Sequence, residues 1–224
     1  MRKTLLATTL LATIAATPAA FAHEAGDIIV RAGAVTVTTH ESTSGVKTSG
    51  LGNLNGKATL NNDTQLGLNF AYMVTDNIGI ELLAASPFKH DVHIKNTDVG
   101  SMKLGSIKHL PPTLSAVYYP LDSKSAFQPY IGAGINYTWF FDENLSSTAK
   151  SGLGANGFKV KNSWGLAAQV GADYMLTDNL MINGQVRYID IDTDATLNTV
   201  AAGRTKVNVD VKPWVYMVGL GYKF

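Results

Sequence analysis

The last eleven residues alternate between large apolar side chains and other residues. Because successive side chains of a strand point to opposite faces, this alternation makes one continuous apolar stripe. Such a stripe is typical of a barrel strand that faces lipid, and the alternative is a half-buried strand that ends a soluble sandwich. The stripe consists of Trp214, Tyr216, Val218, Leu220, Tyr222 and Phe224.

The same period of two recurs in seven earlier segments, although it is less clearly phased in the first of them. None of these segments repeats at three or four residues, so the pattern disfavours helices. The sequence therefore predicts eight strands. They span residues 27–38, 66–72, 78–85, 114–118, 127–139, 164–174, 180–188 and 214–224.

The second face of these strands decides between a soluble barrel and a membrane barrel. A soluble barrel would carry many lysines and glutamates on its outer face, whereas here the second face carries mostly Gly, Asn, Gln, Ser and Thr. Large aromatic residues also stand near strand ends, as in the girdles of membrane barrels. We therefore predict an all-β, eight-stranded antiparallel transmembrane β-barrel. By parity, its lumen is lined by Gln65, Asn69, Glu81, Leu83, Asn136, Gln169, Asp173, Asn183, Gln185 and Arg187.

Short and long connections alternate strictly between the predicted strands. In outer-membrane barrels the short turns and both termini face the periplasm, and the long loops face outside. Two of the short turns are near-duplicates, Met73–Ile78 and Met175–Leu180, which indicates one Asx-type turn used twice. The short connections are 74–77, 120–126 and 176–179, and the long polar ones are 40–62, 89–109, 142–161 and 190–206.

The start of the chain predicts export. Arg2 and Lys3 precede an uncharged apolar run, and an Ala-x-Ala site ends at Ala22. This is the pattern of a secretory signal peptide, so we expect residues 1–22 to be cleaved and 23–224 to form the barrel. The formal net charge of +1 gives no electrostatic case for nucleic-acid binding, and the lack of cysteine excludes disulfides and thiol chemistry.

Little else in the sequence suggests chemistry. His40, His90, His93 and His109 fall in or beside the long loops, where we expect them to be exposed. A metal site built on His90 and His93 is the alternative. Because no nucleophile elbow and no Ser/His/Asp group is present, the sequence predicts no enzyme, no metal and no cofactor.

Several sequence blocks, in order along the chain, resemble the OmpW family of small outer-membrane proteins. The resemblance implies an eight-stranded barrel whose narrow, mostly hydrophobic lumen admits small apolar compounds from outside and releases them sideways into the membrane. Gly219, Tyr222 and the final Phe224 also resemble the C-terminal signal that the barrel-assembly machinery recognises. The blocks are His23–Gly26, Asn62–Leu68, Ala71–Met73, Thr75–Gly79, Glu81–Ala85, His109–Leu114, Pro129–Thr138 and Asp190–Thr193.

Eight strands enclose a space that side chains nearly fill, which excludes a wide water-filled pore. Leu83 fits an apolar constriction, whereas Arg187 stands where the family pattern leads us to expect an aromatic residue. Because an unpaired charge in the lumen is costly, we favour an ion pair of Arg187 with Glu81 or Asp173 over a ligand contact.

These inferences predict a porin-like protein of the outer membrane of a Gram-negative bacterium. It would bind small hydrophobic solutes or let them pass, with outer-membrane lipids around it. One alternative is a structural barrel whose extracellular loops act as a receptor for phage, bacteriocin or a host ligand. A lipid-modifying barrel enzyme is a third class, and it is disfavoured because the sequence offers no convincing serine or histidine for the outer rim.

Overall fold

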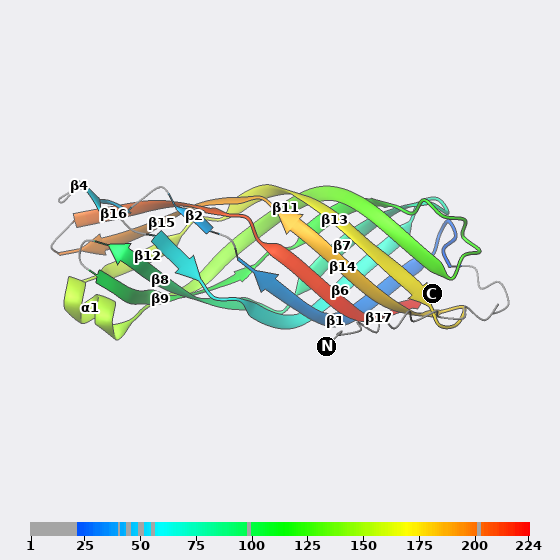
Figure 1. The fold of residues 1–224 in the computed structure, drawn as a ribbon, viewed down its shortest axis with the longest axis horizontal. Coiled ribbons are helices and arrows are strands. Elements are labelled where there is room, and N and C mark those ends of the chain that lie inside the picture. The colour runs from blue at the N-terminus through cyan, green and yellow to red at the C-terminus, as the bar shows by residue number, and fades with distance from the viewer. Residues whose placement is uncertain are drawn as a thin grey trace, which may run out of the picture.

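The computed structural model describes residues 22–39, 41–43, 46–48, 52–54, 57–97, 100–200 and 203–224. The predicted signal peptide lies outside this part of the chain except for Ala22, so its cleavage stays a prediction. His40 lies outside it as well. The described chain is strand almost throughout (Figure 1).

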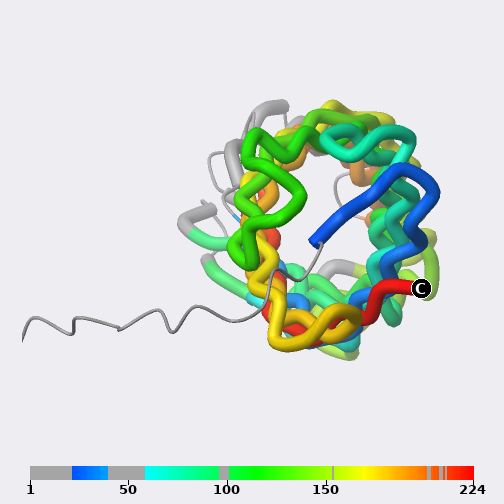
Figure 2. Tube along the Cα trace, turned by 90° about the vertical axis from the view of Figure 1, so that its right-hand side faces the viewer, coloured from blue at the N-terminus to red at the C-terminus, as the bar shows by residue number. Residues whose placement is uncertain are grey.

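Eight of the described strands form a closed antiparallel ring, which Figure 2 shows nearly end-on. Each strand pairs with its two neighbours, and the ladder between the two ends of the series closes the ring. The predicted eight-stranded antiparallel barrel is confirmed. In pairing order the strands are β10 (Thr113–Tyr118), β7 (Ile78–Ala85), β6 (Asp63–Met73), β1 (Ile28–Thr38), β17 (Trp214–Lys223), β14 (Leu180–Ile189), β13 (Ser163–Met175) and β11 (Phe127–Leu145).

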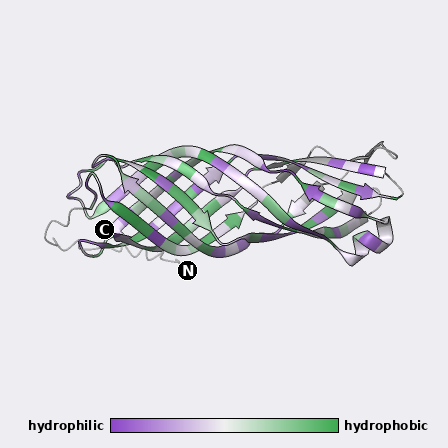
Figure 3. Ribbon diagram, turned by 180° about the vertical axis from the view of Figure 1, so that it is seen from behind, coloured by the Kyte–Doolittle hydropathy of each residue, from purple (hydrophilic) through white to green (hydrophobic). Residues whose placement is uncertain are grey.

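The outer wall of the barrel is apolar, as the sequence pattern predicts. Leu166 is 72% exposed, Val218 66% and Ile131 59%, and they belong to stripes that recur on every strand of the ring. Soluble monomers rarely expose apolar patches of more than a few hundred Å². Figure 3 shows hydrophobic residues concentrated on the barrel half of the molecule and hydrophilic ones toward the opposite end. The apolar band is therefore the surface that lipid covers.

Two short turns at one end of the barrel use the same hydrogen bonds. The Thr75 hydroxyl accepts a bond from the backbone N–H of Ile78 at 3.0 Å, and the Thr177 hydroxyl accepts one from Leu180 at 2.9 Å. One turn solution is thus used twice, although a threonine hydroxyl and not an Asx side chain accepts these bonds. The first described residues and the C-terminus lie beside the short turns, because the N–H of Ala22 donates to the carbonyl of Ser123 and that of Lys223 to the carbonyl of Asn179. We call this end of the barrel, at the right of Figure 1, the turn end and the opposite end the loop end.

The four long connections are largely strands, not the loops that the sequence predicts. β9 (Gly100–Leu110) pairs with the part of β11 that begins at Trp139, and β8 (Phe88–Thr97) pairs with β9, so these strands extend the wall. These strands carry no long apolar stripe because they stand beyond the membrane band. A second sheet and shorter pieces complete the extension: β2 (Glu41–Thr43), β3 (Val46–Thr48), β4 (Gly52–Leu54), β5 (Lys57–Leu60), β12 (Asn156–Val160), β15 (Ile191–Thr199) and β16 (Gly203–Val211).

A short helix, α1 (Ser147–Leu153), lies at the loop end (Figure 1). The Ser146 hydroxyl caps its start by accepting a bond from the N–H of Ala149 at 3.0 Å, and Gly154 ends it in the left-handed conformation. Within the described residues, no helix has the length and apolar character that crossing a bilayer requires.

The seam between the first and last barrel strands depends on two facing glycines. Gly33 of β1 is the register partner of Gly219 of β17. A Cβ added to Gly33 would lie 2.1 Å from the carbonyl oxygen of Val218, and a backbone atom cannot yield without moving its strand. A larger residue at position 33 therefore forces apart the two strands that join the ends of the chain.

We expect Gly33→Ala to lower the free energy of unfolding by about 1 to 3 kcal/mol, because overpacking at a fixed backbone contact costs that much. The urea midpoint of the protein in lipid vesicles measures this loss. Gly184→Ala on neighbouring β14 is the control, since a Cβ there meets nothing within 4 Å. Equal losses in the two variants would contradict the close approach at the seam.

Candidate functional site

The lumen is filled in layers along the barrel axis. The layer nearest the turn end is a buried apolar cluster, in which Tyr119 and Tyr130 pack at a centroid distance of 5.1 Å. Methionines from three strands pack with them, and they share positions next to the short turns. They are Met73, Met175 and Met181.

The chain enters this apolar layer from the turn end. His23 is fully buried, its Nε2 lies 3.3 Å from Oδ2 of Asp173, and its ring meets the ring of Tyr119 at 4.5 Å. The backbone N–H of Ala25 donates to Oδ1 of Asp76 at 2.9 Å. Figure 2 shows this N-terminal stretch inside the ring. The residue predicted to start the mature chain therefore lies in the lumen.

A buried polar layer follows, and its first half is built around Arg31 of β1. Arg31 donates from Nε to Oδ1 of Asp173 at 3.0 Å and from Nη2 to Oδ2 at 2.5 Å, which is a bidentate pair. Nη1 donates to the side-chain oxygen of Asn69 at 3.1 Å, and Nη2 also reaches the hydroxyl of Tyr119 at 2.9 Å. Arg31 and Asp173 are both fully buried.

The second half of the polar layer is built around Glu81 of β7. Arg187 of β14 donates from Nη2 to Oε1 of Glu81 at 2.6 Å, and Nε2 of Gln169 donates to the same oxygen at 2.9 Å. Arg187 also donates to the side-chain oxygen of Gln169. Oε2 of Glu81 lies 3.5 Å from Nη1 of Arg31. Glu81 therefore joins the two arginines in one network.

This polar layer seals the lumen. Its two arginines and two carboxylates balance in charge, and strands from opposite parts of the ring supply them. Buried charges persist only when they are paired and hydrogen-bonded, so removal of any one member leaves a costly unpaired ion. These side chains also fill the cross-section that an eight-stranded barrel allows.

The structure places all ten predicted lumen residues on the inner wall but gives them different surroundings. Asp173, Glu81, Gln169 and Arg187 belong to the polar layer together with Asn69 and Asn183, and Arg187 pairs with Glu81, one of the two carboxylates considered. Gln185 is buried beside Met217. Asn136 bonds the carbonyls of Pro111 and Pro112, and half-buried Gln65 bonds Asp63 nearer the loop end.

Sequence reasoning missed Arg31, the partner of Asp173. The parity of β1 is the signal that could have found it, because Arg31 shares an inward set with Ile29, Val35 and Val37, and all four are buried. Sequence patterns in this strand are weak because small residues occupy both faces around Gly33.

Beyond the polar layer, toward the loop end, the lumen is apolar. Leu83 and Phe88 belong to a buried cluster that also takes side chains from β1, β14 and β17. A second apolar cluster fills the extension beyond the membrane band, and Leu60 and Phe140 pack against both clusters. A continuous apolar path therefore runs from the loop end down to the polar layer.

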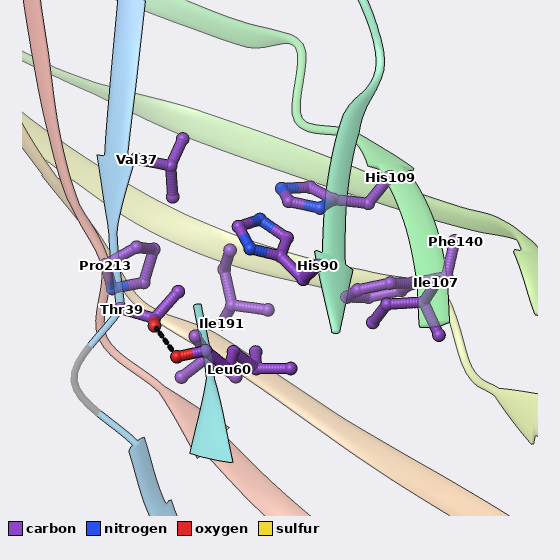
Figure 4. Close-up of a pocket in the computed structure, with 10 residues that line it drawn as sticks. Val37, Thr39, Leu60, His90, Ile107, His109, Phe140, Ile191 and Pro213 are labelled. Carbon is purple, nitrogen blue, oxygen red and sulfur yellow. Dashed lines mark hydrogen bonds between the residues drawn. The ribbon is translucent and has the colours of Figure 1, made fainter. Parts of the chain in front are cut away.

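Two histidines interrupt this apolar path (Figure 4). The sequence predicts them to be exposed, and that expectation is wrong, because His90 is 1% exposed and His109 is 6% exposed. Their rings stack with centroids 4.9 Å apart, and His109 also lies between Phe88 and Phe140. The extension encloses them because β8 and β9 are strands whose inner faces point into the lumen. His93 is half-buried and does not line the same cavity.

The model of the OmpW family matches residues 24–224 of the chain.

The chain belongs to the OmpW family.

Outer membrane protein W of Vibrio cholerae is 43% identical to it over the whole length of both chains. The crystal structure of OprG from Pseudomonas aeruginosa, at 50% identity, superposes with a TM-score of 0.86 over 90% of this chain and 97% of that one. A more distant relative from P. aeruginosa, named dibenzothiophene metabolism operon protein PahQ, is 27% identical over 75% of each chain. Like Outer membrane protein W and OprG, the protein is an outer-membrane barrel of a Gram-negative bacterium. Its turn end faces the periplasm and its loop end faces outside.

Proposed function

We propose that the protein lets small apolar molecules pass from the outside into the outer membrane without an energy source. The apolar path from the loop end to the sealed polar layer carries this proposal. A molecule without charge can replace the side-chain contacts of that path, whereas an ion or a sugar would lose its hydration there. The polar layer blocks the direct way to the periplasm for both.

A sideways exit fits an interruption of the barrel wall beside Leu83. The ladder between β7 and β10 ends at the pair Leu83 and Thr113, and the ladder between β8 and β9 starts again at Phe88 and His109. The segments between these pairs contain Pro87, Pro111 and Pro112, which cannot donate ladder hydrogen bonds. The wall thus lacks ladder hydrogen bonds between these two segments, beside the apolar path.

The name of one relative agrees with this proposal. PahQ is named for the metabolism of dibenzothiophene, an apolar tricyclic compound. A compound of that kind partitions into lipid once it has passed the polar surface of the outer membrane.

Substitutions of Leu83 test the passage. We expect Leu83→Ala to speed the uptake of an apolar dye, N-phenyl-1-naphthylamine, several-fold in cells that produce the protein, and Leu83→Trp to slow it. Fluorescence of the dye in the membrane gives the rate. Opposite changes exclude simple unfolding as the cause, and Leu82→Ala and Leu82→Trp are controls because Leu82 faces lipid. Equal uptake with and without the protein would refute the proposal.

The extension at the loop end supports a second candidate function. One separate polar sheet and the strands β9, β8 and β5 of the barrel sheet stand beyond the membrane band, and passage of a solute alone does not require so large an extension. They could present a binding surface to phage, bacteriocin or a host molecule. Normal phage or bacteriocin sensitivity after exchange of the β12 segment would count against this role.

The last strand supports a proposal about assembly. Tyr222 is 46% exposed and Phe224 70%, and their rings meet edge to face on the outer wall with centroids 4.8 Å apart. We propose that the barrel-assembly machinery recognises this exposed aromatic end. Gly219 has a different role, because it lies at the seam with Gly33 and is required there for packing.

A further inference from the structure

A small cavity lies on the apolar path, at the height of the stacked histidines (Figure 4). Its volume is about 20 Å³, and seven apolar side chains line it together with Thr39, His90 and His109. That volume holds one water molecule or one group of similar size. The cavity is therefore an apolar chamber with few polar atoms in its lining.

The polar atoms around the cavity are not equally satisfied. The Thr39 hydroxyl donates to the carbonyl of Leu60 at 3.4 Å, and Nδ1 of His90 donates to the carbonyl of Asn61 at 2.5 Å. Nδ1 of His109 is buried and has no hydrogen-bond partner among the described residues. A buried polar atom without a partner costs about 1 to 3 kcal/mol. A hydrogen bond from a ligand to this nitrogen would therefore be favourable.

His109 is uncharged at the cavity. Burial, together with the neighbouring His90, lowers the pKa of His109 to about 3, and the charge of Asp63 opposes this shift only in part. A neutral imidazole offers one donor and one acceptor. Since no charged side chain lines the cavity, an ionised ligand group would stay uncompensated there.

We propose that this cavity binds the single uncharged hydroxyl group of an otherwise apolar molecule, such as an aliphatic alcohol or a phenol, through Nδ1 of His109. The inference rests on the proposed function, because it names the class of molecule that the apolar path selects. A water molecule is a poorer occupant, since it needs two to four polar partners and the apolar lining offers few. The apolar part of the ligand replaces contacts of Leu60 and Phe140, which pack against both apolar clusters.

Titration of the protein in lipid nanodiscs with 1-hexanol and n-hexane tests the proposal. The protein carries ¹⁵N-labelled histidine, so a long-range ¹H–¹⁵N spectrum reports the Nδ1 resonance of His109 directly. At equal concentrations in the membrane, we expect hexanol to bind about 5- to 150-fold more tightly than hexane, the factor that corresponds to satisfying one buried group. Hexanol and not hexane should shift the Nδ1 resonance with saturation.

His109→Phe and His93→Phe form the matched pair of variants. Phenylalanine suits position 109 because Phe88 and Phe140 already flank it, and His93 does not line the cavity. We expect His109→Phe to bind both probes with similar affinity and His93→Phe to keep the preference for hexanol. Binding of both probes with no change of preference in His109→Phe would overturn this inference and leave the proposed function intact. Binding of neither probe to any form would overturn both.

Discussion

Replacing Glu81 by alanine is expected to lower the free energy of unfolding by about 3 to 5 kcal/mol, the usual loss when one partner of a buried ion pair is removed. The carboxylate of Glu81 contacts both Arg187, at 2.6 Å, and Arg31, at 3.5 Å. Without it Arg187 keeps only neutral partners in a fully buried position. Urea unfolding in lipid vesicles measures the loss, and conductance in planar bilayers should rise because the seal is broken.

Two further variants separate the loss of the pair from the loss of packing. Glu24→Ala removes an exposed carboxylate at the turn end and should leave stability within about 0.5 kcal/mol of the wild type. The double variant Glu81→Leu with Arg187→Met replaces the pair by apolar side chains, and we expect it to recover part of the stability. If the Glu81→Ala protein had the same stability and the same low conductance as the wild type, the polar layer would not be what closes the lumen.

Placing an arginine on the outer wall is expected to cost about 2 to 4 kcal/mol, because a charge on the lipid face near the bilayer midplane loses its hydration. Val170, near the middle of β13, is 56% exposed on that wall, so Val170→Arg makes the change without disturbing the lumen. The fraction of protein that folds into vesicles of defined lipid, at graded urea concentrations, gives the cost.

Val200→Arg is the matched control for this substitution. Val200 is 83% exposed in a turn between two strands of the extension, so the same change occurs in water. We expect it to alter stability by less than about 0.5 kcal/mol. Equal effects at positions 170 and 200 would mean that the apolar wall does not face lipid.

The barrel itself could be predicted from the sequence because lipid forces a simple pattern on each strand. With apolar side chains outside and small or polar ones inside, the alternation at Trp214–Phe224 fixes both the strand and its parity. The extension could not be predicted in the same way. Strands such as β8 and β15 stand in water on one side, so Lys, Asp and Thr on their outer face resemble the composition of loops.

The candidate site was predictable residue by residue but not as an arrangement. Parity puts Glu81, Asp173 and Arg187 in the lumen, yet the height of each residue along the axis depends on strand register and tilt. That is why the sequence left two possible partners for Arg187 and none for Arg31. The burial of His90 and His109 follows from the pairing of β8 with β9, and no local sequence pattern predicts that pairing.

The transfer of magnetisation from water to the arginine side chains, measured by solid-state NMR in lipid bilayers, tests the sealed lumen most directly. Arg31 and Arg187 are buried in the polar layer, and exposed Arg204 in the extension serves as the reference in the same spectrum. We predict rapid transfer from water to the guanidinium of Arg204 and very slow transfer to those of Arg31 and Arg187. Transfer at the same rate to all three would mean that water fills the lumen, and it would contradict this account.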